Sequence, residues 1–158
     1  YYYLATASLF FFFFLAPDGF WYNTYFNTSY VFNLIGGKEL QVGRHRQNTF
    51  GLKLRGNYRG GFRYTPVDVT SSMKSKRVVY KTRNTYGERL PDFNRVDFGV
   101  SYRINKARNA WILLADIQNV LNTRNVLRRK FSYTNKQIVT ADSKGIGMIP
   151  VLTVRTEF

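Results

Sequence analysis

The side chains that could carry out chemistry are few and widely spaced along the chain. There is no cysteine, so disulfides, thiolate metal sites and cysteine nucleophiles are excluded. The one histidine, His45, leaves no partner for a histidine-based zinc or catalytic site. It lies between Arg44 and Arg46 in a short polar segment, where we expect it to be solvated rather than a ligand.

The carboxylates offer the next candidate chemistry. Asp97, Asp116 and Glu157 fall on the polar faces of three different predicted strands. Paired carboxylates can act as acid and base in hydrolysis, but each of these has arginines close by in the sequence. We therefore expect them to form ion pairs, and we do not predict an enzyme.

The glycine-rich segments do not match nucleotide-binding motifs. Gly51 and Gly56 have the spacing of a P-loop, but Asn57 stands where that motif needs lysine. Gly145 and Gly147 lack the third glycine of a dinucleotide fingerprint and are better explained as a turn. No cofactor or metal is expected.

The charge balance is strongly basic, with 24 Lys and Arg against 9 Asp and Glu and a net charge of +15. Such an excess suggests nucleic acid or an anionic membrane surface. The basic residues, however, lie mainly in short polar stretches, such as 74–89, 103–108 and 124–136, between apolar and aromatic ones. We therefore expect no nucleic-acid partner; a soluble nucleic-acid binder would instead need a charge stripe on a water-soluble fold.

The elements that position these residues are predicted by strict alternation. Segment 50–64 places uncharged residues at every even position, and its lysine and arginines fall at odd positions. This period of two indicates strands whose two faces meet different surroundings. Segments 26–34, 95–104 and 111–118 and the last ten or so residues alternate in the same way. A basic wall is predicted on the polar face, formed by Lys53, Arg55, Arg59, Arg63 and Arg95.

The length of the alternation favours a membrane barrel over a soluble β domain. It persists over about 10 to 15 residues, whereas strands of soluble sandwiches usually run about 5 to 6. A strand tilted across a bilayer needs about 9 to 11 residues. The longest apolar run, 4–16, is too short for a spanning helix. We predict an all-β fold, a transmembrane antiparallel β-barrel.

Six strands are predicted, at 1–14, 25–42, 48–64, 92–104, 109–122 and 147–158. Six are fewer than the eight strands of the smallest bacterial barrels, so the chain is expected to form part of a barrel. Tight turns are predicted at 43–47 and 105–109, and long polar loops at 65–91 and 126–146. If the chain ends on the periplasmic side, the tight turns are periplasmic and the long loops face outward.

Several ordered motifs resemble the late barrel strands of TonB-dependent receptors of the Bacteroidetes type. They are GGKEL (36–40), NTFG (48–51), GGFRYTPVD (60–68), LPDFNRVD (90–97), VSYR (100–103), DIQNVLNTRNV (116–126) and GMIPVL (147–152). The resemblance covers roughly 19–158. It implies that 1–158 is the C-terminal part of an approximately 22-stranded barrel that encloses an N-terminal plug, with the plug and earlier strands outside this sequence.

The resemblance also implies a function and partners. Such receptors lie in the outer membrane of Gram-negative bacteria and import a siderophore, a glycan or a peptide with energy supplied through TonB. The implied partners are the lipid bilayer and lipopolysaccharide, TonB through the missing N-terminal region, the barrel assembly machinery, and a surface lipoprotein lid or larger outer-membrane complex. The basic wall would pair with plug carboxylates or attract an anionic ligand. An alternative is a receptor-like barrel that serves as a scaffold subunit in such a complex.

The C-terminal strand is interpreted as an assembly signal. Leu152, Val154, Thr156 and Phe158 share one face, and an unfolded strand of this kind can add to an open sheet edge. The alternative is that Phe158 is an aromatic residue anchoring the strand at the membrane interface.

Two irregularities complicate the predicted strands. Five consecutive phenylalanines at 10–14 would place aromatic rings on both faces of the first strand, where the resembled receptors carry polar residues. They are either wrongly assigned to that strand or flank a partner, so no function is assigned to 1–16. The glycine pairs at 36–37 and 60–61 would allow a strand to bend or bulge.

Overall fold

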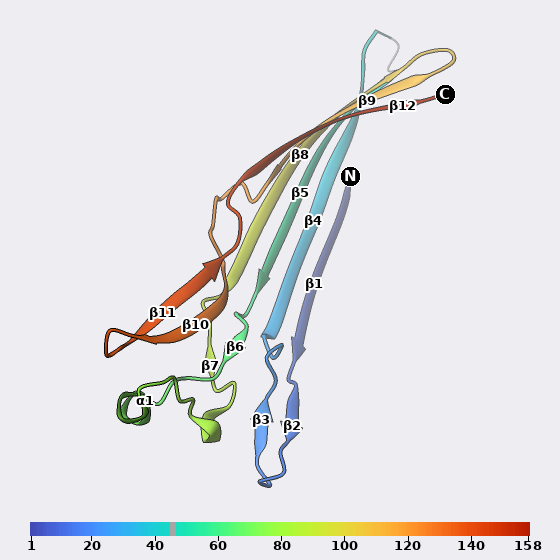
Figure 1. The fold of residues 1–158 in the computed structure, drawn as a ribbon. Helices are drawn as coiled ribbons and strands as arrows, with labels where there is room; N and C mark the ends of the chain where they lie inside the picture. Colours follow the sequence, from blue (N-terminus) through green and yellow to red (C-terminus); the bar gives the residue numbers. More distant parts are fainter. Residues whose placement is uncertain (45–46) are drawn as a thin grey trace.

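The computed structural model describes residues 1–44 and 47–158, and strands dominate it (Figure 1). Six antiparallel strands form one sheet in the order β1-β4-β5-β8-β9-β12. Their bounds are β1 Tyr2–Phe10, β4 Ser29–Val42, β5 Asn48–Arg59, β8 Phe93–Asn105, β9 Ala110–Gln118 and β12 Ile149–Glu157. The all-β prediction and the six predicted strands are confirmed. The expectation for His45 lies outside the described residues.

The register gives this sheet two different faces. Leu54 lies opposite Gly36 on β4 and Phe98 on β8, so apolar positions follow one another from strand to strand. Arg55, the next residue along β5, lies opposite Asp97 and belongs to the other face. Because side chains alternate along a strand, one register makes one face apolar and the other polar across all six strands.

The remaining elements gather at one end of the sheet, the lower end in Figure 1, opposite the end where β4 stops and β5 starts and where the turn at 105–109 lies. They are the pairs β2 Phe13–Leu15 with β3 Trp21–Asn23, β6 Arg63–Tyr64 with β7 Glu88–Arg89, and β10 Val126–Thr134 with β11 Gln137–Lys144, the helix α1 Val69–Ser75 and a 3-10 turn at Thr82–Asn84. We call this region the loop end.

Four predicted strands are too long, and the second of them starts at Ser29 instead of 25. The first ends at Phe10, and the phenylalanine run continues into β2, which pairs with β3 instead of joining the main sheet. Five identical aromatic residues cannot alternate between an apolar and a polar face, so the main strand stops where the run starts. The fifth strand, β9, ends at Gln118, because Asn119 and Asn122 adopt positive φ values of 54° and 53° and turn the chain.

The third strand ends at Arg59 because the two glycines after it pass against other backbone segments. A Cβ on Gly60 would meet the carbonyl oxygen of Thr28, and one on Gly61 would meet that of Leu90. Only residues without a side chain allow this approach. The predicted bend at 60–61 is therefore present, and it moves β6 out of the main sheet.

We expect Gly61→Ala to lower the free energy of unfolding by about 1–3 kcal/mol, because the added methyl forces the Leu90 backbone aside. The matched control is Gly56→Ala on β5, whose Cβ would have its nearest contact with the Leu34 side chain at 3.8 Å. Urea midpoints followed by tryptophan fluorescence measure both. Equal midpoints would contradict the close packing at Gly61.

The segment 126–146 is a regular hairpin, and its prediction as a loop is wrong. β10 and β11 pair from Val126 to Lys144, with Thr134 opposite Gln137. The two residues of the turn, Asn135 and Lys136, have φ values of 51° and 59°. Such turns match the twist of the flanking strands, which explains why so polar a segment forms β structure.

The chain exposes far more surface than a compact protein of its size. Its accessible surface is 11322 Å², whereas a folded monomer of 18.5 kDa exposes about 8,200 Å². The buried apolar residues among those described are Tyr22, Val67, Leu90 and Ala110. The main sheet is also open, because β1 and β12 are each paired on one side. Of the helices in the described ranges, none is long and apolar enough to cross a membrane.

Candidate functional site

The polar face of the sheet carries ion pairs that link neighbouring strands. Lys53 Nζ lies 3.4 Å from Asp116 Oδ1, above Gly99 of the strand between them. Arg55 Nε lies 3.4 Å from Asp97 Oδ2, and Arg95 Nε lies 2.7 Å from Asp97 Oδ1. These contacts give Lys53, Arg55 and Arg95 of the predicted basic wall a carboxylate partner each, with Asp97 shared between the two arginines.

The third predicted carboxylate is paired as well. Glu157 on β12 accepts a hydrogen bond from Arg103 Nη2 at 2.8 Å and lies 2.7 Å from Arg155 Nη2. Asp97, Asp116 and Glu157 therefore each contact a lysine or arginine, which confirms the expected ion pairs.

Two members of the predicted wall differ from that expectation. The Arg59 guanidinium lies 4.2 Å from the ring centre of Phe62 and 4.5 Å from that of Phe93, so it stacks on aromatic rings. Arg63 belongs to β6, outside the six-stranded sheet, because the chain bends at Gly60 and Gly61. Lys53, Arg55 and Arg95 thus share the polar face, whereas Arg63 lies outside the six-stranded sheet. A basic wall that faces a barrel interior stays a prediction.

The opposite face is apolar and exposed. Its larger side chains include Phe32, Leu34, Leu52, Leu54, Phe98, Leu113, Leu152 and Val154, each more than a third exposed. Among the described strand residues of this face, Lys38 alone is charged, and its Nζ lies 4.4 Å from the ring centre of Tyr1. Exposed apolar areas of this extent mark contact with another protein or with lipid.

Aromatic residues with polar partners mark both ends of the apolar face. At the loop end, the hydroxyls of Tyr30 and Tyr58 donate to Asp92 Oδ2 at 2.6 and 2.7 Å. At the tight-turn end, Tyr102 accepts a hydrogen bond from Asn48 at 3.3 Å, and Trp111 lies nearby on β9. Tyrosine and tryptophan occupy such positions where an apolar layer meets water.

Asp92 is held ionised at the loop end. Partial burial acts to raise the pKa of its carboxyl, but the hydrogen bonds from Tyr30 and Tyr58 outweigh it and place the pKa below its usual value. The Gly61 backbone N–H adds a third contact at 3.4 Å. The stabilisation from this carboxylate is therefore present above the pKa of an unfolded aspartate and is lost as the pH falls through the lower, folded value.

The structure brings together two of the motifs that carry the family resemblance. Asp97, from the motif at 90–97, accepts a hydrogen bond from the Asn119 backbone N–H at 2.9 Å. Arg95 donates a hydrogen bond to Gln118 Oε1 at 3.0 Å. The Asn125 side chain accepts a hydrogen bond from the Asn94 backbone N–H and donates one to the Asn94 carbonyl. These contacts fix the corner that follows β9 against the start of β8.

The predicted assembly residues lie on an edge strand. Leu152, Val154 and Thr156 of β12 share the exposed apolar face, and β12 pairs with β9 on one side. Phe158 follows the end of β12 and is almost fully exposed. Their recognition by an assembly machinery stays a prediction.

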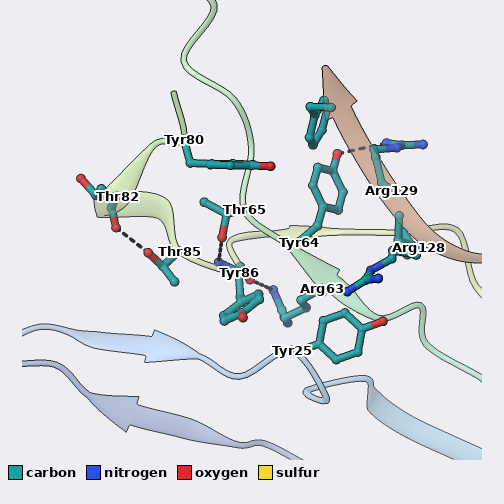
Figure 2. A pocket seen from close by; sticks show the side chains of 12 residues that line it. Tyr25, Arg63, Tyr64, Thr65, Tyr80, Thr82, Thr85, Tyr86, Arg128 and Arg129 are labelled. Atoms are coloured by element: carbon teal, nitrogen blue, oxygen red, sulfur yellow. Dashed lines mark hydrogen bonds between the residues drawn. The ribbon is translucent and has the colours of Figure 1, made fainter. Parts of the chain in front are cut away.

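A pocket of about 380 Å³ lies at the loop end, between β6, the segment before β7, and β10 (Figure 2). Its walls combine aromatic rings, hydroxyls and arginines from four separate segments. The residues used below are Tyr25, Arg63, Tyr64, Tyr80, Tyr86, Arg128, Arg129 and Phe131.

Of the three arginines in this pocket, Arg129 forms an ion pair, with Asp142. Its Nε and Nη2 donate to the two oxygens of Asp142 at 2.8 Å each, and Nη1 donates to the Tyr64 hydroxyl at 3.1 Å. The hydrogen bonds from Arg129 lower the pKa of Asp142. This bidentate pair crosses from β10 to β11 and fixes the Tyr64 ring, so we assign it a positioning role.

Arg63 and Arg128 are not neutralised in this way. Arg63 donates through Nε to the Asn27 carbonyl at 3.0 Å and through Nη1 to the carbonyls of Tyr86 and Gly87. Burial, aided by the charge of Arg89, lowers its pKa. Among the acids in the described ranges, none forms an ion pair with Arg63 or Arg128. The pocket therefore carries positive charge and can attract an anion.

Sequence reasoning missed this pocket because its walls come together through tertiary contacts of the loop end. The available signal was the tyrosines at 64, 80 and 86 within a segment interpreted as a polar loop. In the described part of the chain, no group of His, Cys, Asp and Glu side chains is arranged to hold a metal ion.

No protein-family model, curated protein or solved structure matches this chain. The resemblance to TonB-dependent receptors therefore depends on the motifs of the sequence itself.

Proposed function

We propose that the chain forms part of the wall of an outer-membrane β-barrel, with its apolar face in lipid and its polar face toward the barrel interior. The observation that supports this most strongly is the division of charge between the two faces. Ion pairs span the polar face, while Lys38 is the one charged side chain on the described apolar face.

Strand length and surface area agree with this proposal. The central strands β4, β5 and β8 have 14, 12 and 13 residues, and β1, β9 and β12 have 9 each. A tilted strand needs about 9 to 11 to cross a bilayer. The backbone groups at both open edges must be paired in lipid, so further strands would complete the barrel. The excess exposed surface is then covered by lipid and by those strands.

We further propose that this barrel is a TonB-dependent receptor of the Bacteroidetes type that imports a siderophore, a glycan or a peptide. The motifs at 60–68, 90–97 and 116–126 support the kinship, and the contact of Asp97 with Asn119 gives two of them a shared structural role. An outer membrane has no ATP supply, so import needs energy delivered through TonB. A scaffold role would instead leave the complex assembled and working in cells without TonB.

Surface labelling tests the orientation. Cysteines introduced at Ser75 on α1 and at Ser143 on β11 should react with a membrane-impermeant maleimide on intact cells, because both positions are exposed at the loop end. Gln47→Cys, in the tight turn at the opposite end, should react only after the outer membrane is opened. The chain has no cysteine of its own, so each label reports one position.

If Gln47→Cys alone were labelled on intact cells, the proposed orientation of the chain would be wrong, and the tight-turn end would face outward. Equal labelling of all three variants in protein recovered without detergent would contradict the membrane location itself.

A further inference from the structure

We propose that the pocket at the loop end binds a small ring compound that carries one carboxylate, of the size of a monosaccharide acid or a single-ring aromatic acid. This inference goes beyond the barrel wall, because it concerns residues outside the six-stranded sheet.

The volume of the pocket sets the size of the ligand. About 380 Å³ lies near the lower end of the range for small-molecule sites, which is about 300–1,000 Å³. A cavity of about 150 Å³ already holds a benzene molecule, so this pocket has room for one ring with its substituents and surrounding water, whereas an extended chain of rings would protrude from it.

The charge of the pocket favours an anion. Arg129 is satisfied by Asp142, but Arg63 and Arg128 have no acidic partner among the described residues. Arg63 is held by backbone carbonyls, which fix its position without neutralising it. A planar guanidinium presents paired N–H donors that match the two oxygens of a carboxylate.

The aromatic residues favour a ring. Tyr80 packs edge-on against Phe131 with ring centres 6.3 Å apart, and Tyr86 packs edge-on against Tyr25 at 6.2 Å. Figure 2 shows Tyr80 and Tyr25 on opposite sides of the pocket. Rings held by other rings offer firm faces for stacking, at little further cost in side-chain entropy. The hydroxyls of Tyr80 and Tyr86 supply donors for a polar substituent.

Calorimetric titration of the purified full chain tests the proposal with two matched pairs of probes. D-glucuronate is compared with D-glucose, and benzoate with benzyl alcohol. We expect the acid of at least one pair to bind about ten-fold or more tightly than its neutral counterpart, which corresponds to about 1.4 kcal/mol. The pair that shows this difference identifies the ring as a sugar or as aromatic. Acetate, which has the carboxylate and no ring, should bind at least about ten-fold more weakly than that acid.

Two variants separate the roles of charge and ring. Arg128→Gln should weaken binding of the preferred acid about ten-fold, while the control Arg124→Gln, at an exposed position between β9 and β10, should leave it unchanged. Tyr80→Leu should weaken binding of the ring acid and leave binding of acetate unaltered. Circular dichroism of each variant checks that the β content is retained.

The proposal is overturned if neither acid binds more tightly than its neutral counterpart, or if Arg128→Gln and Arg124→Gln have the same effect. These readouts do not depend on insertion into a membrane, so a failure here is distinguishable from a failure of the barrel assignment, which the cysteine labelling reports.

Discussion

Leu54→Arg is expected to leave most of the protein unfolded, with a loss of about 2–4 kcal/mol in the free energy of unfolding in lipid. Leu54 lies near the middle of β5 on the apolar face, and 42% of its surface is exposed. Its neighbours across the strands are Gly36 and Phe98, which offer no acid to pair with a guanidinium. In the proposed barrel wall, a charge there would face the centre of the hydrocarbon layer.

The matched control is Asn33→Arg on the neighbouring strand. Asn33 lies on the polar face, is exposed, and stands opposite the uncharged Thr6 and Asn57. Asn57 itself would be a poorer control, because Arg95 lies directly opposite it. The same arginine at position 33 should change the free energy of unfolding by less than about 1 kcal/mol.

Urea titration in lipid vesicles and heat-dependent mobility in gels measure both variants. If Leu54→Arg and Asn33→Arg behaved alike in lipid, the apolar face would not contact hydrocarbon. If Leu54→Arg lowered the free energy of unfolding in lipid but not in aqueous buffer, the result would support the assignment of this sheet to a barrel wall.

The main sheet could be predicted from the sequence because alternation is a local property. Charges at odd positions of segment 50–64 are sufficient to assign its two faces, and the same pattern elsewhere gives the other strands. Strand ends were less predictable, since they depend on contacts distant in sequence. β5 stops at Arg59 because Gly60 and Gly61 pass against the backbone of Thr28 and Leu90, a contact that neither segment shows alone.

Other features could not be predicted from the sequence, because they depend on the strand register or on how distant segments pack together. The acids on the polar face were expected to pair with arginines, but the register decides that Asp97 takes Arg55 and Arg95 while Asp116 takes Lys53. The segment 126–146 was predicted as a loop because it is long and polar, whereas its residues pair as a hairpin around the turn at Asn135 and Lys136. The pocket requires four segments to meet, and no single segment carries its pattern.

Asp97→Ala is expected to destabilise the protein more than any other single removal of charge on the polar face. Asp97 is 9% exposed and holds three partners: Arg55, Arg95 and the Asn119 backbone N–H. Without it, two guanidiniums lose their counterion and a buried N–H loses its acceptor. Removal of one partner from a buried pair costs about 3–5 kcal/mol. Both arginines are partly exposed, which reduces the cost, so we expect Asp97→Ala to lower the free energy of unfolding by about 2–3 kcal/mol.

Two further variants show how much of this loss of stability comes from the charge of Asp97 and how much depends on its burial. Asp97→Asn keeps a side-chain oxygen for the Asn119 N–H and removes the charge, so it should cost about half as much as Asp97→Ala. Asp116→Ala removes an acid of the same face whose pair with Lys53 is more exposed, and it should cost at most about 1 kcal/mol.

Urea midpoints at low and at about 0.5 M salt distinguish the two acids, because salt screens exposed pairs more than buried ones. The cost of Asp116→Ala should shrink at high salt, while most of the cost of Asp97→Ala should remain. If Asp97→Ala were no worse than Asp116→Ala, the link from β8 to the corner after β9 would not stabilise the sheet. The contact that joins the motifs at 90–97 and 116–126 would then have no role in stability.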